Sequence, residues 1–392
     1  MIIDFQNTEV AFASKSDTDL NRAYLLFKTV ASPKIVGLGK AFVNTALKLH
    51  IPFAWAIKPT IYKHFVGGET IPDCYNAIRT LEKFNVKAVL DYSVEGKEEE
   101  NDIQMAMEET LRAIDNAGKD ANIPFCVFKP TAMVQSKVLE KVSSGAELSE
   151  LEKKQADNFR NRIQTLCQRA FDLDIPILID AEDSWYQQFI DDVTNANMAK
   201  FNKKKAIVFN TFQMYRWDRL DFLAKSYEMA VEGNYFLGAK FVRGAYMEKE
   251  RERALQMGYP SPIQPDKAAS DRDYNAALKY CIERIDRISV FNGTHNEESC
   301  QYLIDLMEEK GIAKNDNRVY TAQLYGMSDH ISFNMAKEGY NVAKYLPYGP
   351  VKHVTPYLLR RAEENTSAAG QSGRELSLIL KEKSRRQMAR KV

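Results

Sequence analysis

The sequence is poor in the residues that build metal centres and disulfide frameworks. Its 392 residues include five cysteines and five histidines, and no His-x-His pair occurs. The cysteines are widely scattered, so no close pair predicts a zinc site or a disulfide, and a reducing compartment is favoured. They are Cys74, Cys126, Cys167, Cys281 and Cys300.

The sequence also lacks a strong charge imbalance and any long apolar run. Its 54 Lys and Arg against 53 Asp and Glu leave a net charge of +1, which gives no support for a nucleic-acid partner. No run approaches the ~20 apolar residues of a membrane span. The N-terminus carries Asp4, Glu9 and Asp17 without an apolar h-region, so no targeting signal is expected. We expect a cytoplasmic protein, at most peripheral on the inner face of the cell membrane.

What the sequence does contain is a repeated pattern of short β-rich runs, each followed by a longer helical segment. Several runs are continuous Ile, Val and Phe stretches, as expected of parallel strands covered on both faces. The runs are Val86–Asp91, Phe125–Lys129, Ile175–Asp180, Ala206–Gln213, Ala239–Arg243, Ser289–His295, Arg318–Gln323 and Asn341–Leu346. Eight such units predict an α/β fold, a (β/α)8 barrel of the triosephosphate-isomerase type.

Three regions are expected along the chain. Residues 1–65 read as an N-terminal helical extension, with helices over Thr18–Val30 and Ile35–Leu49. Residues 66–370 form the barrel. Residues 371–392 form a basic tail with apolar residues set among Lys and Arg. That composition predicts reversible contact of the tail with an anionic membrane surface.

Polar side chains stand where the predicted strands finish. In barrels of this type the chemistry sits at the carboxyl ends of the strands, so these positions are candidates for a site. They are Asp91, Lys129, Asp180, Gln213, Arg243, His295, Gln323 and Tyr345.

A second candidate feature is the stretch from Tyr345 to Asn365. A turn at Pro347–Pro350 leads to Thr355-Pro356, which predicts a helix N-cap and a first-turn proline. Two adjacent arginines, Arg360 and Arg361, lie on that helix. Guanidinium groups present planar forks of donors, so the pair is suited to holding a carboxylate.

This stretch resembles the C-terminal signature of the proline dehydrogenase family, in which a tyrosine precedes the first of two arginines by the interval that separates Tyr345 from Arg360. The resemblance extends from about Phe65 to Asn365, in order and at the predicted strand ends. Its other motifs are Gly68-Glu-Thr-Ile71, Leu90-Asp-Tyr-Ser-Val-Glu95, Phe128-Lys-Pro-Thr-Ala132, Ile179-Asp-Ala-Glu-Asp183, Thr211-Phe-Gln-Met-Tyr215, Lys240-Phe-Val-Arg-Gly-Ala-Tyr246, Gly293-Thr-His-Asn296 and Gln323-Leu-Tyr-Gly-Met-Ser-Asp329.

The resemblance implies a role for each matched residue. Arg360, Arg361 and Lys129 would hold the substrate carboxylate, and Tyr345 would pack on the pyrrolidine ring. The supporting substrate-site residues would be Asp180 beneath Arg361, Glu95 paired with Arg360 in the free enzyme, Glu364 bracing the helix, and Tyr246. A non-covalent flavin adenine dinucleotide (FAD) site would be lined by Gln213, Lys240, Arg243, Gly244, Ala245, Tyr246, Thr294, His295 and Asn296.

The implied reaction is the oxidation of L-proline to 1-pyrroline-5-carboxylate, the first step of proline catabolism. Side chains cannot accept a hydride, so FAD would take it from proline C5 at its N5 atom. A quinone would then receive the electrons.

Four other interpretations stay open from the residues. Within the family, trans-4-hydroxy-L-proline is the alternative substrate. Asp180, Glu182 and His295 could form a carboxylate–imidazole metal site of a barrel hydrolase. Lys129 could form a Schiff base. A non-catalytic binding barrel is the fourth interpretation.

Overall fold

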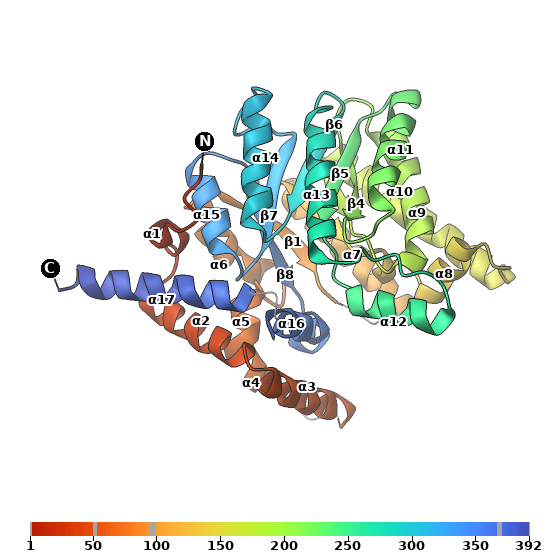
Figure 1. Cartoon of the computed structure of the whole chain (residues 1–392). Coiled ribbons are helices and arrows are strands. Elements are labelled where there is room, and N and C mark those ends of the chain that lie inside the picture. The colour runs from red at the N-terminus through yellow and green to blue at the C-terminus, as the bar shows by residue number, and fades with distance from the viewer. Residues whose placement is uncertain (1, 50–52, 95–98, 367–370, 392) are drawn as a thin grey trace. The chain divides into compact units, whose positions relative to one another are not determined.

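The eight predicted strands close into one parallel barrel in sequence order (Figure 1). The computed structural model describes residues 2–49, 53–94, 99–366 and 371–391. The strands are β1 (Val86–Tyr92), β2 (Phe125–Phe128), β3 (Ile177–Ile179), β4 (Val208–Gln213), β5 (Leu237–Val242), β6 (Ile288–Gly293), β7 (Val319–Leu324) and β8 (Val342–Tyr348). Each lies within or within two residues of the run that predicted it, so the (β/α)8 prediction is confirmed.

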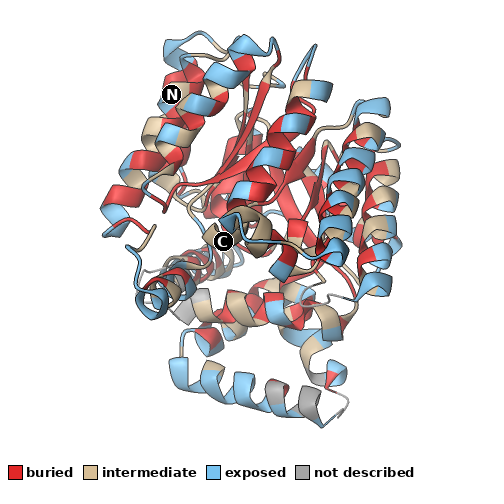
Figure 2. Ribbon diagram, turned by 90° about the vertical axis from the view of Figure 1, so that its right-hand side faces the viewer, coloured by how far each residue is buried: buried red, intermediate tan, exposed pale blue. Residues whose placement is uncertain are grey.

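The strands are buried because helices cover the outside of the barrel while side chains fill its inside. Every residue of β2, β4 and β8 is buried, and Figure 2 shows the strands red against helices banded red and pale blue. The register places Val89 opposite Phe125, and Lys240 opposite Phe291. The ring of Phe125 meets those of Phe209, Phe291 and Tyr320 at centroid distances of 5.8, 4.9 and 4.8 Å.

Helices separate the strands, as the pattern predicted. Between β1 and β7 they are α7 (Glu100–Ala117), η2 (Pro130–Ala132), α8 (Ser136–Ser144), α9 (Glu150–Asp172), α10 (Ser184–Phe201), α11 (Arg219–Glu232), α12 (Met247–Met257), α13 (Lys267–Ile282) and α14 (Glu297–Glu309). Outside that span they are α1 (Thr8–Ala11), α2 (Asp17–Val30), α3 (Pro33–Lys48), α4 (Ala54–Ile57), η1 (Lys58–Tyr62), α5 (Lys63–Phe65), α6 (Ile71–Glu82), α15 (Asp329–Lys337), α16 (Val351–Thr366) and α17 (Gln371–Ala389).

The predicted start of the arginine-bearing helix is wrong. Helix α16 begins at Val351, directly after the turn, and Pro356 lies inside it. The amides of His353 and Val354 both donate to the Pro350 carbonyl, at 2.8 and 3.1 Å. Thr355 is not a cap, because its hydroxyl donates to the carbonyl of Val351 at 2.7 Å. The helix therefore starts one turn earlier than the Thr-Pro pair indicates.

The chain forms two compact units. The first is built mainly from Ala88–Tyr92 and Gly96–Ala322, and the second from Ile3–Lys87, Ser93–Glu95 and Gln323–Val392. The second unit has its own apolar core, in which Phe27 and Phe65 are almost completely buried with Val354 and Leu378. The expected division into residues 1–65, 66–370 and 371–392 stays a prediction.

The basic tail forms the packed helix α17. Leu378 and Ile379 are buried in the core of the second unit. Arg386 donates to Asp17 at 2.8 Å and to the carbonyls of Phe12 and Lys15 at 2.9 Å. Arg386 is therefore engaged by other parts of the same chain. Because this cation is less available to anionic lipids, the sequence argument for membrane contact of the tail is weaker.

No helix in the described part of the chain combines the length and the apolar character needed to cross a membrane.

Candidate active site

Asp180 lies at the centre of a buried charge cluster in the first unit. It follows β3, where the parallel strands present their carboxyl ends. Its Oδ2 accepts from Lys129 Nζ at 3.4 Å, and its Oδ1 accepts a short hydrogen bond from Lys240 Nζ. Lys129 follows β2 and Lys240 lies within β5. Three strands thus bring one carboxylate and two ammonium groups together.

The charges in this cluster stabilise one another. Burial alone would raise the pKa of Asp180, but Lys240 and Lys129 hold it below its usual value. Burial works in the opposite direction on Lys129, yet Asp180 and neighbouring groups raise its pKa well above the ordinary value. Lys129 is therefore a permanent cation. Burial lowers the pKa of Lys240 despite the attraction of Asp180.

Glu182 connects further predicted residues to this cluster. Its backbone carbonyl accepts from Gln213 Nε2 at 2.6 Å, and its carboxylate accepts from the Thr131 hydroxyl at 2.8 Å. The Tyr246 hydroxyl lies 3.4 Å from the same carboxylate. Burial raises the pKa of Glu182. Glu182 thus fixes Gln213 at the end of β4 and Tyr246 at the start of α12.

Arg243 is the centre of a second group, beyond the end of β5. Its guanidinium donates to Asp271 at 2.6 Å, to the Thr294 hydroxyl at 2.7 Å and to the Ser299 hydroxyl at 3.0 Å. It also lies over the Tyr274 ring, 4.3 Å from its centroid. Arg243 is therefore held beside the segment that joins β6 to α14.

That segment carries Thr294, His295 and Asn296. The Asn296 side chain caps α14 by accepting from the Ser299 amide at 3.0 Å, and the Asn296 amide donates to Thr294 Oγ1 at 3.1 Å. A guanidinium beside a helix N-terminus is a donor set that suits the diphosphate of a dinucleotide.

Gly244 lets the backbone after β5 lie directly against the Tyr215 ring. Its φ of +132° is rarely adopted by other residues, and an added Cβ would lie 2.5 Å from the Tyr215 ring. Gly244 and Ala245 are exposed, whereas Lys240 is buried. The exposed backbone of Gly244 and Ala245, the Lys240 cation and the N-terminus of α14 are groups that suit a flavin dinucleotide.

The remaining predicted substrate residues belong to the second unit. Tyr345 is buried on β8, and its carbonyl accepts from the Tyr325 amide at 2.8 Å. Arg360 and Arg361 lie on α16, where Arg361 is 8% exposed and sits 5.2 Å from the Tyr357 ring centroid. Glu95 and the Glu364 side chain lie outside the described part of the structure.

Sequence reasoning missed the residues that hold the predicted ones in place. Asp271 binds Arg243 from α13, and Thr131 binds Glu182 from η2. Asp271 does not lie at a strand end, Thr131 has no assigned role in the motif after β2, and each residue is far in sequence from its partner. Glu182 was noticed as a metal ligand, whereas the structure makes it a hydrogen-bond anchor. Within the described residues, no three His, Cys, Asp or Glu side chains are grouped as a metal site.

Comparisons with known proteins place these features in a family. The family model for proline dehydrogenase matches residues 74–374. The carbapenem antibiotics biosynthesis protein CarD of Pectobacterium carotovorum is 35% identical over 322 residues, covering 82% of this chain and 83% of its own length. Proline dehydrogenase 1, mitochondrial, of Dictyostelium discoideum is 30% identical over 429 residues, covering 97% of this chain and 74% of that protein.

A hydroxyproline dehydrogenase and a solved structure are also similar. The hydroxyproline dehydrogenase of Xenopus laevis is 29% identical over 412 residues, 96% of this chain and 88% of that protein. Proline utilization A (PutA) from Bdellovibrio bacteriovorus, inactivated by N-propargylglycine, superposes with a TM-score of 0.71 at 20% identity. The match covers 93% of this chain and 37% of the PutA chain, so this chain spans about a third of that protein. The family model covers most of the chain, and the chain belongs to the proline dehydrogenase family.

Proposed function

We propose that this protein oxidises L-proline to 1-pyrroline-5-carboxylate, with FAD bound non-covalently and a quinone as electron acceptor. The observation that carries the proposal is the cluster in which Lys129 and Asp180, at the ends of β2 and β3, meet Lys240 from within β5 of a barrel from this family. Proline carries a carboxylate, and this anion forms its strongest hydrogen bonds with cationic donors such as those of the cluster.

Lys129 is the part of this cluster that suits the substrate carboxylate. Its bond to Asp180 is long, at 3.4 Å, whereas the Lys240 bond is short. An ammonium group has three donors, so Lys129 can contact Asp180 and a substrate oxygen together. Asp180 keeps the Lys129 charge in place. Arg360 and Arg361 are the matched partners for the same carboxylate on α16.

The flavin would be held by the residues that the family resemblance matches to its site, namely Gln213, Lys240, Arg243, Gly244, Ala245, Tyr246, Thr294, His295 and Asn296. When bound, it supplies the hydride acceptor that no side chain provides. The Lys240 cation favours negative charge developing close to it. Arg243 and the start of α14 would provide donors for the diphosphate.

Two alternatives from other reaction classes lose support. A Schiff-base lysine must be neutral to attack a carbonyl, but the raised pKa of Lys129 keeps it protonated. A metal at Asp180 would compete with two ammonium groups that already bind its two oxygens. Neither class accounts for the arginine pair on α16.

Hydroxyproline is the second candidate substrate, because a hydroxyproline dehydrogenase is among the similar proteins. Tyr345 bears on this choice, because a bulky wall packed on the pyrrolidine ring leaves little room for a 4-hydroxyl group. A hydrophobic wall rejects an added hydroxyl by about 10²-fold at most, so steric exclusion must add to it.

The test compares kcat/KM for L-proline with kcat/KM for trans-4-hydroxy-L-proline, with a soluble dye as the electron acceptor. Wild type should prefer proline strongly. Tyr345→Ser should lower kcat/KM for proline through lost packing and narrow the gap to hydroxyproline. A wild-type preference for hydroxyproline would overturn the substrate assignment. If Tyr345→Ser kept the wild-type ratio of kcat/KM for the two substrates, Tyr345 would not determine the choice between them.

A further inference from the structure

The proposed reaction requires a group that accepts a proton from the substrate. At neutral pH the ring nitrogen of free proline is a protonated ammonium group, which has no lone pair. A hydride can leave C5 only if a nitrogen lone pair forms the new C=N bond. A side chain that removes this proton is therefore a general base of the reaction. The need for such a base rests on the proposed function.

Three acids follow β3, and they differ in what neutralises them. Asp180 and Asp183 are each paired with lysines. The Glu182 carboxylate instead accepts from the Thr131 hydroxyl at 2.8 Å and lies 3.4 Å from the Tyr246 hydroxyl. Within the described part of the chain, Glu182 is the one acid of these three that forms no ion pair. Its negative charge is thus available to an incoming cation.

Burial makes Glu182 a better proton acceptor than its neighbour Asp180. Glu182 is 5% exposed, and burial raises its pKa, while the charge of Lys129 and the hydrogen bond from Thr131 act in the opposite direction. The charges of Asp180 and Asp183 raise the pKa of Glu182 further. For Asp180, by contrast, two lysines hold the pKa below its usual value. A raised pKa brings the Glu182 carboxylate closer to the value that suits a base near neutral pH.

Glu182 is also held close to the residue that suits the substrate carboxylate. Thr131, which binds the Glu182 side chain, lies two residues after Lys129, and the charges of Glu182 and Lys129 attract each other. In proline a single carbon separates the ring nitrogen from the carboxylate, so a proline anchored on Lys129 has its nitrogen close to this pair of residues. The Glu182 amide donates to Gln187 Oε1 at 2.9 Å, and its carbonyl accepts from Gln213 at 2.6 Å. The carboxylate is therefore held in place before a substrate binds.

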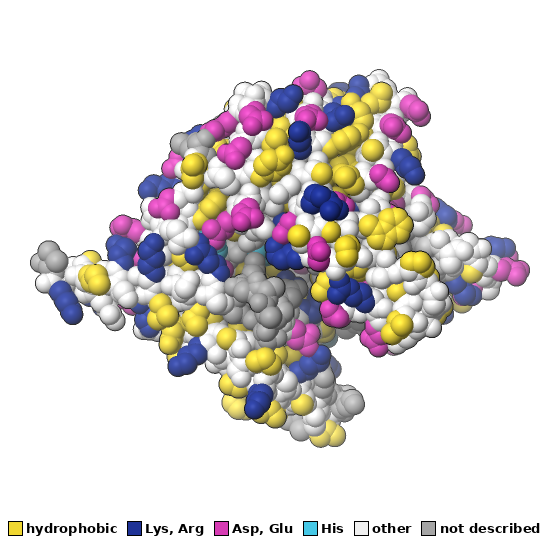
Figure 3. All heavy atoms as spheres, in the orientation of Figure 1, with side chains coloured by type: hydrophobic (Ala, Val, Ile, Leu, Met, Phe, Trp, Pro, Cys, Tyr) yellow, Lys and Arg dark blue, Asp and Glu magenta, His cyan; other side chains and the backbone are white. Residues whose placement is uncertain are grey.

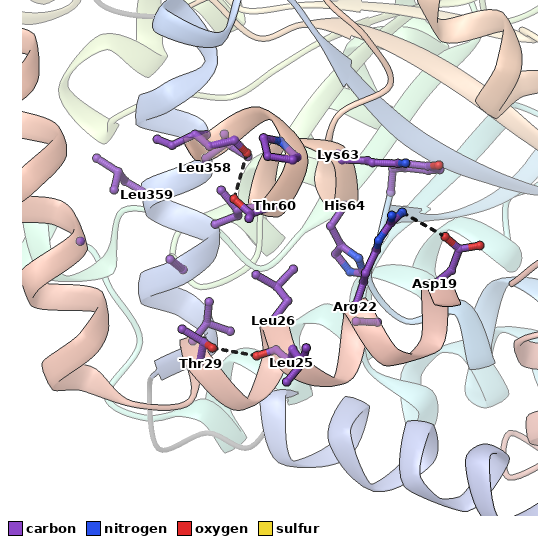
Figure 4. Close-up of a pocket in the computed structure, with 18 of the residues that line it drawn as sticks. Asp19, Arg22, Leu25, Leu26, Thr29, Thr60, Lys63, His64, Leu358 and Leu359 are labelled. Atoms are coloured by element: carbon purple, nitrogen blue, oxygen red, sulfur yellow. Dashed lines mark hydrogen bonds and ion pairs between the residues drawn. The ribbon is translucent and has the colours of Figure 1, made fainter. Parts of the chain in front are cut away.

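The acids of a pocket in the second unit lack this combination of burial and free charge. The pocket has a volume of about 740 Å³ and lies between α2, α3, η1 and α16, in a region where the chain carries seven Lys and Arg and no Asp or Glu between Asp19 and Glu69. Asp19 and Asp329 line it. The Asp19 carboxylate lies 3.9 Å from the Arg22 guanidinium, which it faces in Figure 4. The Asp329 carboxylate lies 2.8 Å from Lys344 Nζ. Cations thus compensate both carboxylates.

We propose that Glu182 is the general base that accepts the ammonium proton of bound L-proline. In this step an N–H bond of the substrate breaks, an O–H bond forms at the Glu182 carboxylate, and the ring nitrogen keeps the electron pair. That pair forms the second bond of C=N when a hydride leaves C5 for the oxidised flavin. Glu182 then releases the proton to water. Thr131 is a positioning residue, because its hydroxyl holds the Glu182 carboxylate and favours its charged form.

The experiment measures the rate of flavin reduction by L-proline from acidic to alkaline pH, in the anaerobic FAD-loaded protein, by stopped-flow absorbance. Glu182→Gln removes the base but keeps an oxygen that can accept from Thr131. Thr131→Val keeps the base but removes the hydroxyl that stabilises its charge. Figure 3 shows exposed acids scattered among Lys and Arg side chains. The matched control, Glu150→Gln, changes an acid of this exposed class, since the Glu150 side chain is 90% exposed.

In wild type and Glu150→Gln the rate should fall as the pH drops and Glu182 becomes protonated. Glu182→Gln should lose roughly 10²-fold or more in rate at neutral pH. Its rate should recover at alkaline pH, where proline in solution is already a neutral amine. Thr131→Val should retain the fall at acidic pH but shift it to higher pH, because the lost hydrogen bond had lowered the pKa of Glu182.

Binding of L-tetrahydro-2-furoate, which has an oxygen atom in place of the amine, tests the site without proton transfer. Calorimetry should show that Glu182→Gln binds it at least as tightly as wild type does, because no ammonium group is involved. Loss of this binding would make Glu182 a structural residue and overturn the assignment.

The kinetic data can overturn the assignment in three further ways. Glu182→Gln could keep the wild-type rate and pH dependence, its loss in rate could persist undiminished at alkaline pH, or Thr131→Val could leave the fall at acidic pH where it was. A different result identifies a failure of the proposed function. If L-proline reduced the wild-type flavin at no pH, the proposed function would be overturned, and the assignment of Glu182 with it.

Discussion

At the scale of single residues, Asp180 determines the charge state of the candidate site. It contacts two ammonium groups that the fold has taken out of water. Asparagine has the same shape without the charge. We expect Asp180→Asn to leave Lys129 and Lys240 facing each other uncompensated, at a cost of about 3–5 kcal/mol in the free energy of unfolding. Urea unfolding measures this loss.

A surface aspartate provides the matched control for that substitution. Asp157 pairs with Arg160 at 2.8 Å, but its side chain is 70% exposed, so Asp157→Asn should change stability by less than about 1 kcal/mol. Asp180→Asn should also raise KM for proline, because Lys129 loses the partner that positions it. Unfolding curves for Asp180→Asn that overlay those of wild type would contradict the cluster described above.

His64 predicts a pH dependence of stability. Its Nε2 lies 2.8 Å from the Gly326 carbonyl oxygen, and burial, with a smaller contribution from Lys15, lowers its pKa from 6.5 to about 4. Between these values the unfolded chain binds a proton that the folded chain does not. Stability should therefore fall by roughly 2–3 kcal/mol as the pH drops from about 6.5 to 4.

The measurement is the free energy of unfolding of wild type and His64→Gln over this pH range. The variant should lose most of the slope between pH 6.5 and 4. A separate loss belongs to Asp329, whose pKa is held at about 2 by Lys344 and Lys15 against the effect of burial. That loss should begin only below pH 3.8 and persist in the variant. Equal slopes in the two proteins above pH 4 would show that His64 does not stay neutral in the folded chain.

At the scale of elements, the strands could be predicted from the sequence because buried parallel strands are continuous apolar runs. The run at Ala206–Gln213 became β4, and the interrupted run at Ser289–His295 still became β6. The start of α16 could not be predicted correctly, because the turn before Val351 determines it while Pro356 is tolerated inside the helix. Lys129 and Asp180 were identified at strand ends, and Lys240 through the family resemblance. Asp271 was not, because its relation to Arg243 exists only in three dimensions.

Helix α17 predicts the result of a C-terminal truncation. Leu378 and Ile379 are 1% exposed, and Glu382 accepts from Arg385 and Arg386. Removing residues 375–392 should destabilise the protein by several kcal/mol, since burying one such apolar side chain contributes about 1.5–3 kcal/mol. Thermal unfolding of the truncated and full chains measures the loss.

The milder variant Arg390→Ala separates packing from charge at the end of the same helix. The Arg390 side chain is 70% exposed, so its loss should cost less than about 1 kcal/mol. A truncated chain that unfolds at the same temperature as the full chain would contradict the packing of α17.

At the scale of the whole molecule, the proposed chemistry draws on distant parts of the chain. Lys129, Asp180 and Lys240 belong to one compact unit, and Tyr345, Arg360 and Arg361 belong to the other. The near-neutral net charge likewise conceals a cationic, apolar segment between Asp19 and Glu69. Both features follow from how residues are distributed along the chain, which composition alone does not reveal.

The most direct test of the proposed activity is the visible absorbance of the purified protein under anaerobic conditions. The proposal predicts a yellow protein whose flavin is released on denaturation. Adding L-proline should bleach the flavin absorbance, and adding a quinone should restore it. A flavin-loaded protein whose spectrum does not change with L-proline would contradict the proposal, as would a folded protein that neither carries nor takes up FAD.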